Sequence, residues 1–349
     1  MAKIDALFYE LIKRNASDLH LAQNKKPKFR IHGDLVEIGE HPVLTVEYLS
    51  DILSEIVRPT LWQKFKETGD IDFACALDNG ARFRANYLRH FHGYGAVFRL
   101  IPSKLLTFED MGVPEICKEL CDLQAGLVLV TGPTGSGKSS TLAAMIDYIN
   151  LKHIKKIVTI EEPIEFFHKN KKCIITHREV GLDTVSFAQG LRSALKSDAN
   201  IILVGEMRDR ETIELALTAA EMGILVFGTL HTNSAAKTID RIVDTFPGAK
   251  KSQIREILAN TLQAVVAQQL IKSTNGSRRW GAFEILVRTT ALPAIIRAND
   301  TKALKNEINT HAKEGMISMD NYLLNLVRED KISNEAAYLK ALDKALFKK

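Results

Sequence analysis

The chain has 349 residues, of which 46% are hydrophobic and 26% are charged, and its formal net charge is +5. This length allows about two domains, and the composition is typical of a globular protein. So small a basic excess does not indicate nucleic-acid binding, and we expect no nucleic-acid partner. The sequence holds no apolar run near the roughly 18 residues that span a bilayer, and no signal-peptide core at its N-terminus. We therefore expect a cytoplasmic protein without an integral membrane segment.

The first hundred residues have the pattern of a small α+β domain. Residues 4–13 carry apolar side chains at helical spacing, which predicts an amphipathic helix. Residues 27–36 are predicted to form a hairpin that turns at Gly33-Asp34. Further strands are expected over residues 71–77, 81–87 and 95–101. Antiparallel strands with few helices predict an α+β domain over residues 1–100.

The pattern changes after this domain. Residues 101–106 contain Pro102 and are polar, so we expect them to form a linker. In residues 107–349, short apolar segments alternate with helical stretches. The expected strands are residues 126–131, 156–160, 200–205 and 225–229. The alternation predicts an α/β fold with a parallel sheet and helices on both faces, followed from about Ala282 by a polar helical region.

Residues 132–140 fit the phosphate-loop pattern G-x-x-x-x-G-K-[ST]. A predicted strand precedes them and a predicted helix follows, and these flanks argue against a chance match in a glycine-rich turn. Glycines let backbone N–H groups converge on phosphate oxygens, and the helix N-terminus adds partial positive charge. We expect Lys138 to reach the β- and γ-phosphates of ATP and Ser139 to coordinate Mg²⁺. The predicted binding set is Gly132, Pro133, Thr134, Gly135, Ser136, Gly137, Lys138, Ser139 and Ser140.

Acidic residues follow two later strands of the same domain. Glu161, Glu162 and Glu165 lie just past the end of a predicted strand, where ligands bind in open α/β sheets. Without the phosphate loop, this segment would be interpreted as an acidic surface turn. With it, one of these carboxylates could orient or deprotonate an attacking water. Glu206 follows the next apolar strand and a glycine, and we expect it to interact with the Mg²⁺ ion and its water.

One histidine and several arginines are further candidates. His231 follows another strand, where it and Thr229 could respond to the γ-phosphate, although a lone histidine there is as often structural. Arg82, Arg84 and Arg99 lie on predicted strands of the first domain. A guanidinium from outside the nucleotide domain could act as an arginine finger, whereas the default interpretation is surface charge.

Together these motifs resemble those of the type IV pilus retraction ATPases, within the type II and type IV secretion ATPases. The matching segments are residues 16–21 (N-terminal signature), 132–139 (Walker A), 160–166 (Asp box), 203–209 (atypical Walker B) and 228–232 (His box). They occur in the family's order and cover nearly the whole chain. The resemblance implies a PAS-like domain over residues 1–100 and a RecA-like ATPase domain over residues 107–349.

The resemblance also assigns roles to residues. Glu165 would be the catalytic glutamate, Glu206 the Walker B residue and His231 a sensor. Arg84 and Arg99 would approach the nucleotide from the N-terminal domain. Arginines that could add to that set are Arg178 and Arg192. The implied protein is a homo-hexamer that uses ATP and Mg²⁺ to act on an inner-membrane platform protein, peripheral to that membrane, and so drives pilus retraction and twitching motility.

Two departures from the family's pattern keep alternatives open. Glu162 replaces the aspartate of the Asp box, which keeps the charge and lengthens the reach. Pro293 stands where the family's C-terminal retraction motif has its first arginine. The alternatives are therefore an accessory pilus or secretion ATPase that does not suffice for retraction, a RecA-like nucleic-acid motor, and a regulatory subunit that binds nucleotide without hydrolysing it.

Overall fold

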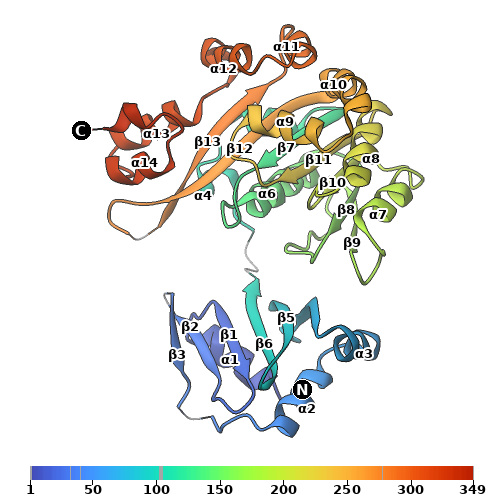
Figure 1. Cartoon of the computed structure of the whole chain (residues 1–349), viewed down its shortest axis with the longest axis vertical. Coiled ribbons are helices and arrows are strands. Elements are labelled where there is room, and N and C mark those ends of the chain that lie inside the picture. The colour runs from blue at the N-terminus through green and yellow to red at the C-terminus, as the bar shows by residue number, and fades with distance from the viewer. Residues whose placement is uncertain (1, 32, 40, 102–104, 277, 349) are drawn as a thin grey trace. The chain divides into compact units, whose positions relative to one another are not determined.

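The computed structural model describes residues 2–31, 33–39, 41–101, 105–276 and 278–348. The chain divides into two compact units, Met1–Lys104 and Leu105–Lys349 (Figure 1). The predicted linker over residues 101–106 includes residues 102–104, which lie outside the described residues. Among the described residues, no helix has both the length and the apolar character needed to cross a membrane.

Unit 1 is built on a six-stranded sheet in the order β3-β2-β1-β6-β5-β4, in which every neighbouring pair is antiparallel. Its strands are β1 Asp18–Ala22, β2 Lys28–Ile31, β3 Asp34–Glu37, β4 Asp70–Ala76, β5 Arg82–His90 and β6 Gly93–Ile101. Its helices are α1 Asp5–Lys13, α2 Val46–Glu55 and α3 Pro59–Thr68. The strands predicted in the first hundred residues are confirmed. The PAS-like character of this unit stays a prediction.

The predicted amphipathic helix is α1, and its apolar face forms part of the core of unit 1. Leu7, Phe8 and Leu11 are buried, and the ring of Phe8 stacks on that of Phe83 in β5 at 4.1 Å between centroids. Burial of aromatic side chains of this size is a major stabilising term for so small a unit. Helix α1 therefore packs on the sheet through β5 and, by the contact of Phe8 with Phe98, through β6.

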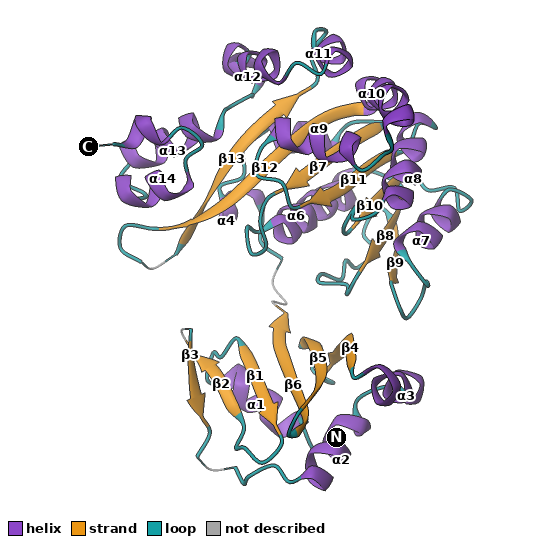
Figure 2. Ribbon diagram, in the orientation of Figure 1, coloured by secondary structure: helices purple, strands orange, loops and turns teal. Residues whose placement is uncertain are grey.

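Unit 2 is built on a seven-stranded sheet in the order β13-β12-β7-β11-β10-β8-β9 (Figure 2). Its strands are β7 Gly126–Thr131, β8 Lys156–Glu161, β9 Ile174–Glu179, β10 Ile201–Val204, β11 Leu225–Leu230, β12 Leu262–Lys272 and β13 Arg279–Val287. Its helices are α4 Phe108–Met111, α5 Ile116–Cys121, α6 Lys138–Lys152, α7 Phe187–Ala194, α8 Arg210–Glu221, α9 Ala235–Asp244, α10 Gly248–Thr261, α11 Leu292–Ala298, α12 Thr301–Thr310, α13 Met319–Arg328 and α14 Asn334–Lys340.

The predicted parallel sheet is confirmed for β7 to β12, which pair in parallel. Every residue of β7, β10 and β11 is buried, so both faces of the sheet centre are covered. Strands covered on both faces are apolar without alternation, which is why these segments could be recognised in the sequence.

The prediction of a helical region from about Ala282 is wrong for its first residues. Residues 282–287 belong to β13, which pairs antiparallel with β12. The run Gly281–Val287 is buried throughout, and a short apolar run cannot be distinguished by periodicity from a buried helix. The helices of the region begin only with α11, and Met319 and Leu323 of α13 pack with Ile271 and Ala282 of the hairpin.

Candidate nucleotide site

The motifs of unit 2 meet because four neighbouring strands are parallel. The phosphate loop follows β7, the acidic segment follows β8, Glu206 follows β10, and His231 follows β11. The strand order places β7, β11, β10 and β8 side by side. Their carboxyl ends therefore lie at one edge of the sheet, which is where α/β folds bind ligands.

Glycines shape the phosphate loop where a side chain would collide with the neighbouring strand. Gly132 has φ +144, and a Cβ there would lie 2.2 Å from the carbonyl oxygen of Gln268 in β12. Gly137 has φ +90, and a Cβ there would lie 2.9 Å from Nε2 of Gln268. The Gln268 side chain itself accepts a hydrogen bond from Thr141 Oγ1 at 2.8 Å. Strand β12 thus packs directly against the phosphate loop and bonds to the first turn of α6.

The loop has the donors that a phosphate chain requires. The hydroxyls of Thr131 and Ser136 are buried and meet no hydrogen-bond partner within the described part of the chain. Lys138 Nζ donates to the carbonyl oxygens of Gly132 at 2.7 Å and Pro133 at 3.2 Å. Buried polar groups are normally paired, so unpaired hydroxyls beside an ammonium group fit a ligand rich in acceptor oxygens.

A hollow of about 380 Å³ adjoins Ser139 at the start of α6. Its lining residues come from α6 and from the ends of the neighbouring strands: Ser139, Leu142, Ala143, Ile146, Thr159, Glu161, Phe166, His168, Leu203, Gly205 and Thr229. Gly205 permits a close approach of β10 to β8 there, because a Cβ would lie 3.1 Å from the carbonyl oxygen of Ile160. The hydroxyl of Thr229 donates to the Gly205 carbonyl and ties β11 to the end of β10.

The carboxylates of Glu206 and Glu165 act electrostatically on the ammonium group of Lys138. Burial lowers the pKa of Lys138, and the carboxylates of Glu206 and Glu165 oppose that shift. Burial away from water disfavours the charged form of a lysine, whereas nearby carboxylates favour that form. The structure therefore brings both predicted acids close enough to influence the lysine of the phosphate loop.

Glu206 is held in its ionised form by basic neighbours. Oε1 of Glu206 lies 2.9 Å from Nε2 of His231 and 2.6 Å from Nε of Arg208. Burial raises the pKa of Glu206, but the hydrogen bond and charge of Arg208, together with His231, lower it below its ordinary value. Arg208 also lies 3.8 Å from Glu162. An ionised carboxylate in this position can order a cation or a water molecule.

The predicted arginines of unit 1 lie together on its sheet. Arg84 of β5 and Arg99 of β6 are register partners, and Arg99 also pairs in register with Asp18 of β1. Nε of Arg99 donates to Oδ1 of the buried Asp18 at 2.8 Å, while the Arg99 side chain is 67% exposed. Arg84 makes a longer contact, 3.8 Å, to Asp72. Their approach to the nucleotide stays a prediction.

The structure also shows residues that the sequence interpretation missed. Gln268 accepts a hydrogen bond from Thr141 in the first turn of α6, directly after the phosphate loop. His177 and Glu179 of β9 contact the segment that carries Glu165. The available signal was weak in each case: two consecutive glutamines in an apolar strand, and polar residues in a strand that had not been predicted. Of the added candidates, Arg178 of β9 donates to the carbonyl oxygen of Asp183, in the turn that follows the strand.

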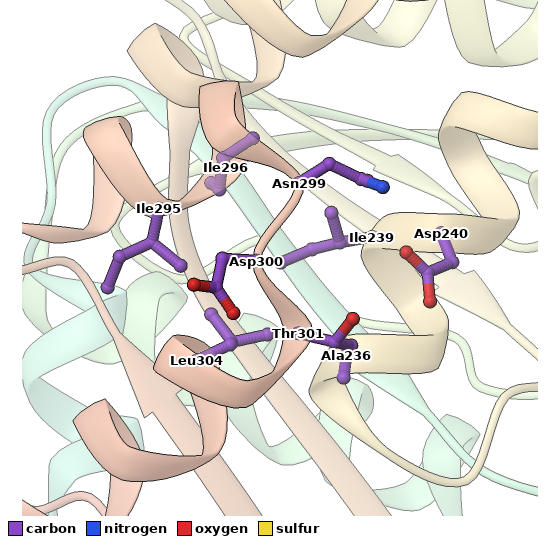
Figure 3. A pocket seen from close by; sticks show the side chains of 9 residues that line it. All are labelled: Ala236, Ile239, Asp240, Ile295, Ile296, Asn299, Asp300, Thr301 and Leu304. Carbon is purple, nitrogen blue, oxygen red and sulfur yellow. The ribbon is translucent and has the colours of Figure 1, made fainter.

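A second hollow, of about 240 Å³, is lined by residues of α9, α11, α12 and the α11–α12 connection, none of which belongs to the phosphate loop (Figure 3). It is lined mainly by aliphatic side chains, with polar groups from α9 and from the α11–α12 connection: Ala236, Ile239, Asp240, Ile295, Ile296, Asn299, Asp300, Thr301 and Leu304. Arg297 of α11 instead pairs with Glu256 of α10 through two hydrogen bonds, at 2.7 and 2.9 Å.

A parallel sheet, a phosphate loop at the end of β7 and carboxylates at the ends of β8 and β10 define a P-loop ATPase of the RecA-like class. Comparisons with known proteins agree. The family described as type II/IV secretion system protein matches residues 1–338. The chain is 49% identical to the type IV pilus retraction ATPase PilT of Pseudomonas aeruginosa, over 94% of this chain and 95% of that protein.

Two further relatives support this result. The chain is 46% identical to a twitching motility protein of Neisseria gonorrhoeae, over 90% of this chain and 84% of that protein. A crystal structure of the pilus retraction motor PilT with bound ADP superposes with a TM-score of 0.91 at 40% identity, over 99% of this chain and 98% of that chain. The chain therefore belongs to the type II/IV secretion ATPases and, within them, to the PilT family of pilus retraction ATPases.

Proposed function

We propose that the chain is a hexameric, Mg²⁺-dependent ATPase motor that drives retraction of type IV pili. The observation that carries the proposal is the convergence of Lys138, Glu165, Glu206 and His231 at one edge of the sheet, on a chain 49% identical to PilT. The basic experiment measures phosphate release by the purified chain with and without Mg²⁺. It then measures twitching of a retraction-deficient strain that carries the gene.

In this mechanism each residue of the site has a separate task. The phosphate loop and Lys138 bind the β- and γ-phosphates, and Glu165 accepts the proton of the attacking water. Ser139 and Glu206 would hold Mg²⁺, which supplies charge neutralisation on the phosphate oxygens. The hydrogen bond between His231 and Glu206 connects the end of β11 to the proposed Mg²⁺ site.

We further propose that six copies form a ring and that guanidinium groups of unit 1 complete the site. Opening and closing of the ring's subunits would displace a platform protein in the inner membrane, to which the hexamer is peripheral. The support is the PilT relationship and the exposed guanidinium of Arg99. Its Nε donates to Asp18 while its side chain is 67% exposed, and a guanidinium group has further N–H donors for an anion.

Arg99→Ala should lower kcat about 10³-fold, because an arginine finger stabilises charge that develops only in the transition state. Arg84→Ala should lower kcat as well, and the looser contact of Arg84 predicts the smaller effect. The measurement is steady-state ATP turnover, with size-exclusion chromatography to verify the hexamer and a melting curve to verify folding. Wild-type turnover by both variants in intact hexamers would identify both arginines as ordinary surface charges.

The C-terminal departure predicts that hydrolysis and retraction can be separated. Pro293 lies in the first turn of α11, where its missing N–H is tolerated. It is partly exposed, so an arginine can replace it without filling the core. We expect robust ATPase activity but only partial rescue of twitching by the unmodified gene, and improved rescue by Pro293→Arg.

The control for this prediction is Ala294→Arg, which adds the same charge at the exposed neighbouring position. It should leave rescue unchanged. Full rescue by the unmodified gene would show that this segment does not limit retraction. The nucleic-acid motor is tested in parallel, because it alone predicts that single-stranded DNA stimulates ATP turnover.

A further inference from the structure

The segment that carries Glu165 is anchored on both sides by the edge strand β9. The backbone N–H of Ile164 donates to Oε2 of Glu179 at 3.2 Å. The backbone N–H of His168 donates to Nε2 of His177 at 3.1 Å. His177 and Glu179 are two residues apart on one strand, so their side chains leave the same face. Glu165 lies between the two anchored amides.

The imidazole of His177 makes a second bond to the core of the site. Its Nδ1 lies 2.9 Å from Oγ1 of Thr159, and Thr159 is the register partner of His177 on β8. Nε2 also lies 3.4 Å from the His168 carbonyl oxygen, farther than from the His168 amide nitrogen at 3.1 Å. In the tautomer in which Nε2 accepts from that amide, Nδ1 carries the proton and donates it to the threonine hydroxyl. Thr159 lines the hollow that adjoins Ser139. One ring thus joins the Glu165 segment to the strand that ends at the nucleotide.

Two rings of the same segment hold the imidazole in place. The ring of His168 stacks on that of His177, with centroids 5.8 Å apart and an interplanar angle of 14°. The ring of Phe167 meets it edge-on at 5.1 Å. The His177 side chain is only 10% exposed. With contacts on its faces and bonds at both nitrogens, the ring has little freedom to rotate.

We propose that His177 is a positioning residue that fixes Glu165 for general-base catalysis. This inference deepens the proposed function and rests on the assignment of Glu165 as the base. A general base must lie within hydrogen-bond reach of the water it deprotonates. Residues 162–168 lie in a connection without regular structure, so the clamp on the His168 amide limits where the Glu165 carboxylate can move. Glu179 provides the second anchor.

His177→Ala should lower kcat about 10- to 100-fold, the loss expected when a reacting group is displaced by about 1 Å. The KM for ATP and the binding of a fluorescent ADP analogue should remain near the wild-type values, because the phosphate loop is untouched. His177→Gln should restore most of kcat, since its amide oxygen reaches the position of Nε2. His177→Asn reaches only the position of Nδ1 and should behave like the alanine variant.

The matched control is His153→Gln, in another partly buried histidine that bonds Asp122 instead of the Glu165 segment. It should keep wild-type kcat. Wild-type turnover by His177→Ala, or equal losses in the Gln and Asn variants, would overturn the proposal. If the alanine variant does not fold, the comparison of Gln with Asn still decides. Glu165→Gln is measured alongside: its full activity would instead remove the proposed base, a result distinct from failure of the clamp.

Discussion

Lys138→Ala should abolish ATP turnover and weaken nucleotide binding. The ammonium group of Lys138 is the cation of the phosphate loop, and it donates to the carbonyls of Gly132 and Pro133. The same loop region has two buried hydroxyls that no described residue pairs with. In the proposed mechanism, alanine removes the charge that stabilises the β- and γ-phosphates in both the ground state and the transition state. Loss of a preorganised electrostatic contact costs about 10²- to 10³-fold in kcat, and the weaker binding adds to it.

The matched control is Lys152→Ala, which lies on the same helix α6. Lys152 forms a surface ion pair with Asp122 at 2.7 Å, and such exposed pairs contribute little to stability. Its turnover should equal that of the wild type. Phosphate release and titration with a fluorescent ADP analogue measure the two effects separately. A Lys138→Ala protein that hydrolyses ATP at the wild-type rate would show that the phosphate loop is wrongly assigned.

The sequence predicted those parts of unit 2 whose signal is local. The strands β7, β10 and β11 are apolar because both faces are covered, and the phosphate loop follows directly from one of them. Once parallel strands are predicted, the residues after their carboxyl ends must lie at one edge of the sheet. This is why Glu165, Glu206 and His231 could be grouped with Lys138 from the order of motifs along the chain.

The parts that could not be predicted depend on pairings between distant segments. The contact of Gln268 with Thr141 spans 127 positions of sequence and requires β12 to lie beside β7. His177 reaches Thr159 only because β9 pairs with β8 in one particular register. Neither β9 nor β12 has a local pattern that fixes its neighbour, and shifting a strand by one residue would turn the same side chain to the other face.

Glu165→Gln should suppress kcat while nucleotide binding stays nearly intact. The amide keeps the size of the carboxylate but cannot accept a proton, and loss of a general base costs about 10²- to 10⁴-fold. Glu165 is partly buried, and its backbone is anchored by the amides of Ile164 and His168, so glutamine should adopt the same position. Single-turnover measurements separate the chemical step from ATP binding and product release.

Glu161→Gln distinguishes among the carboxylates of the same segment. Glu161 lines the hollow beside Ser139 and lies 3.9 Å from His177, so its side chain is next to the site but belongs to the end of β8. We expect the Glu161 variant to lose much less kcat than the Glu165 variant, because only Glu165 lies in the segment clamped by β9. If Glu161→Gln is inactive and Glu165→Gln turns over ATP normally, Glu161 and not Glu165 is the general base. The contacts of His177 and Glu179 would then anchor a segment that takes no part in proton transfer.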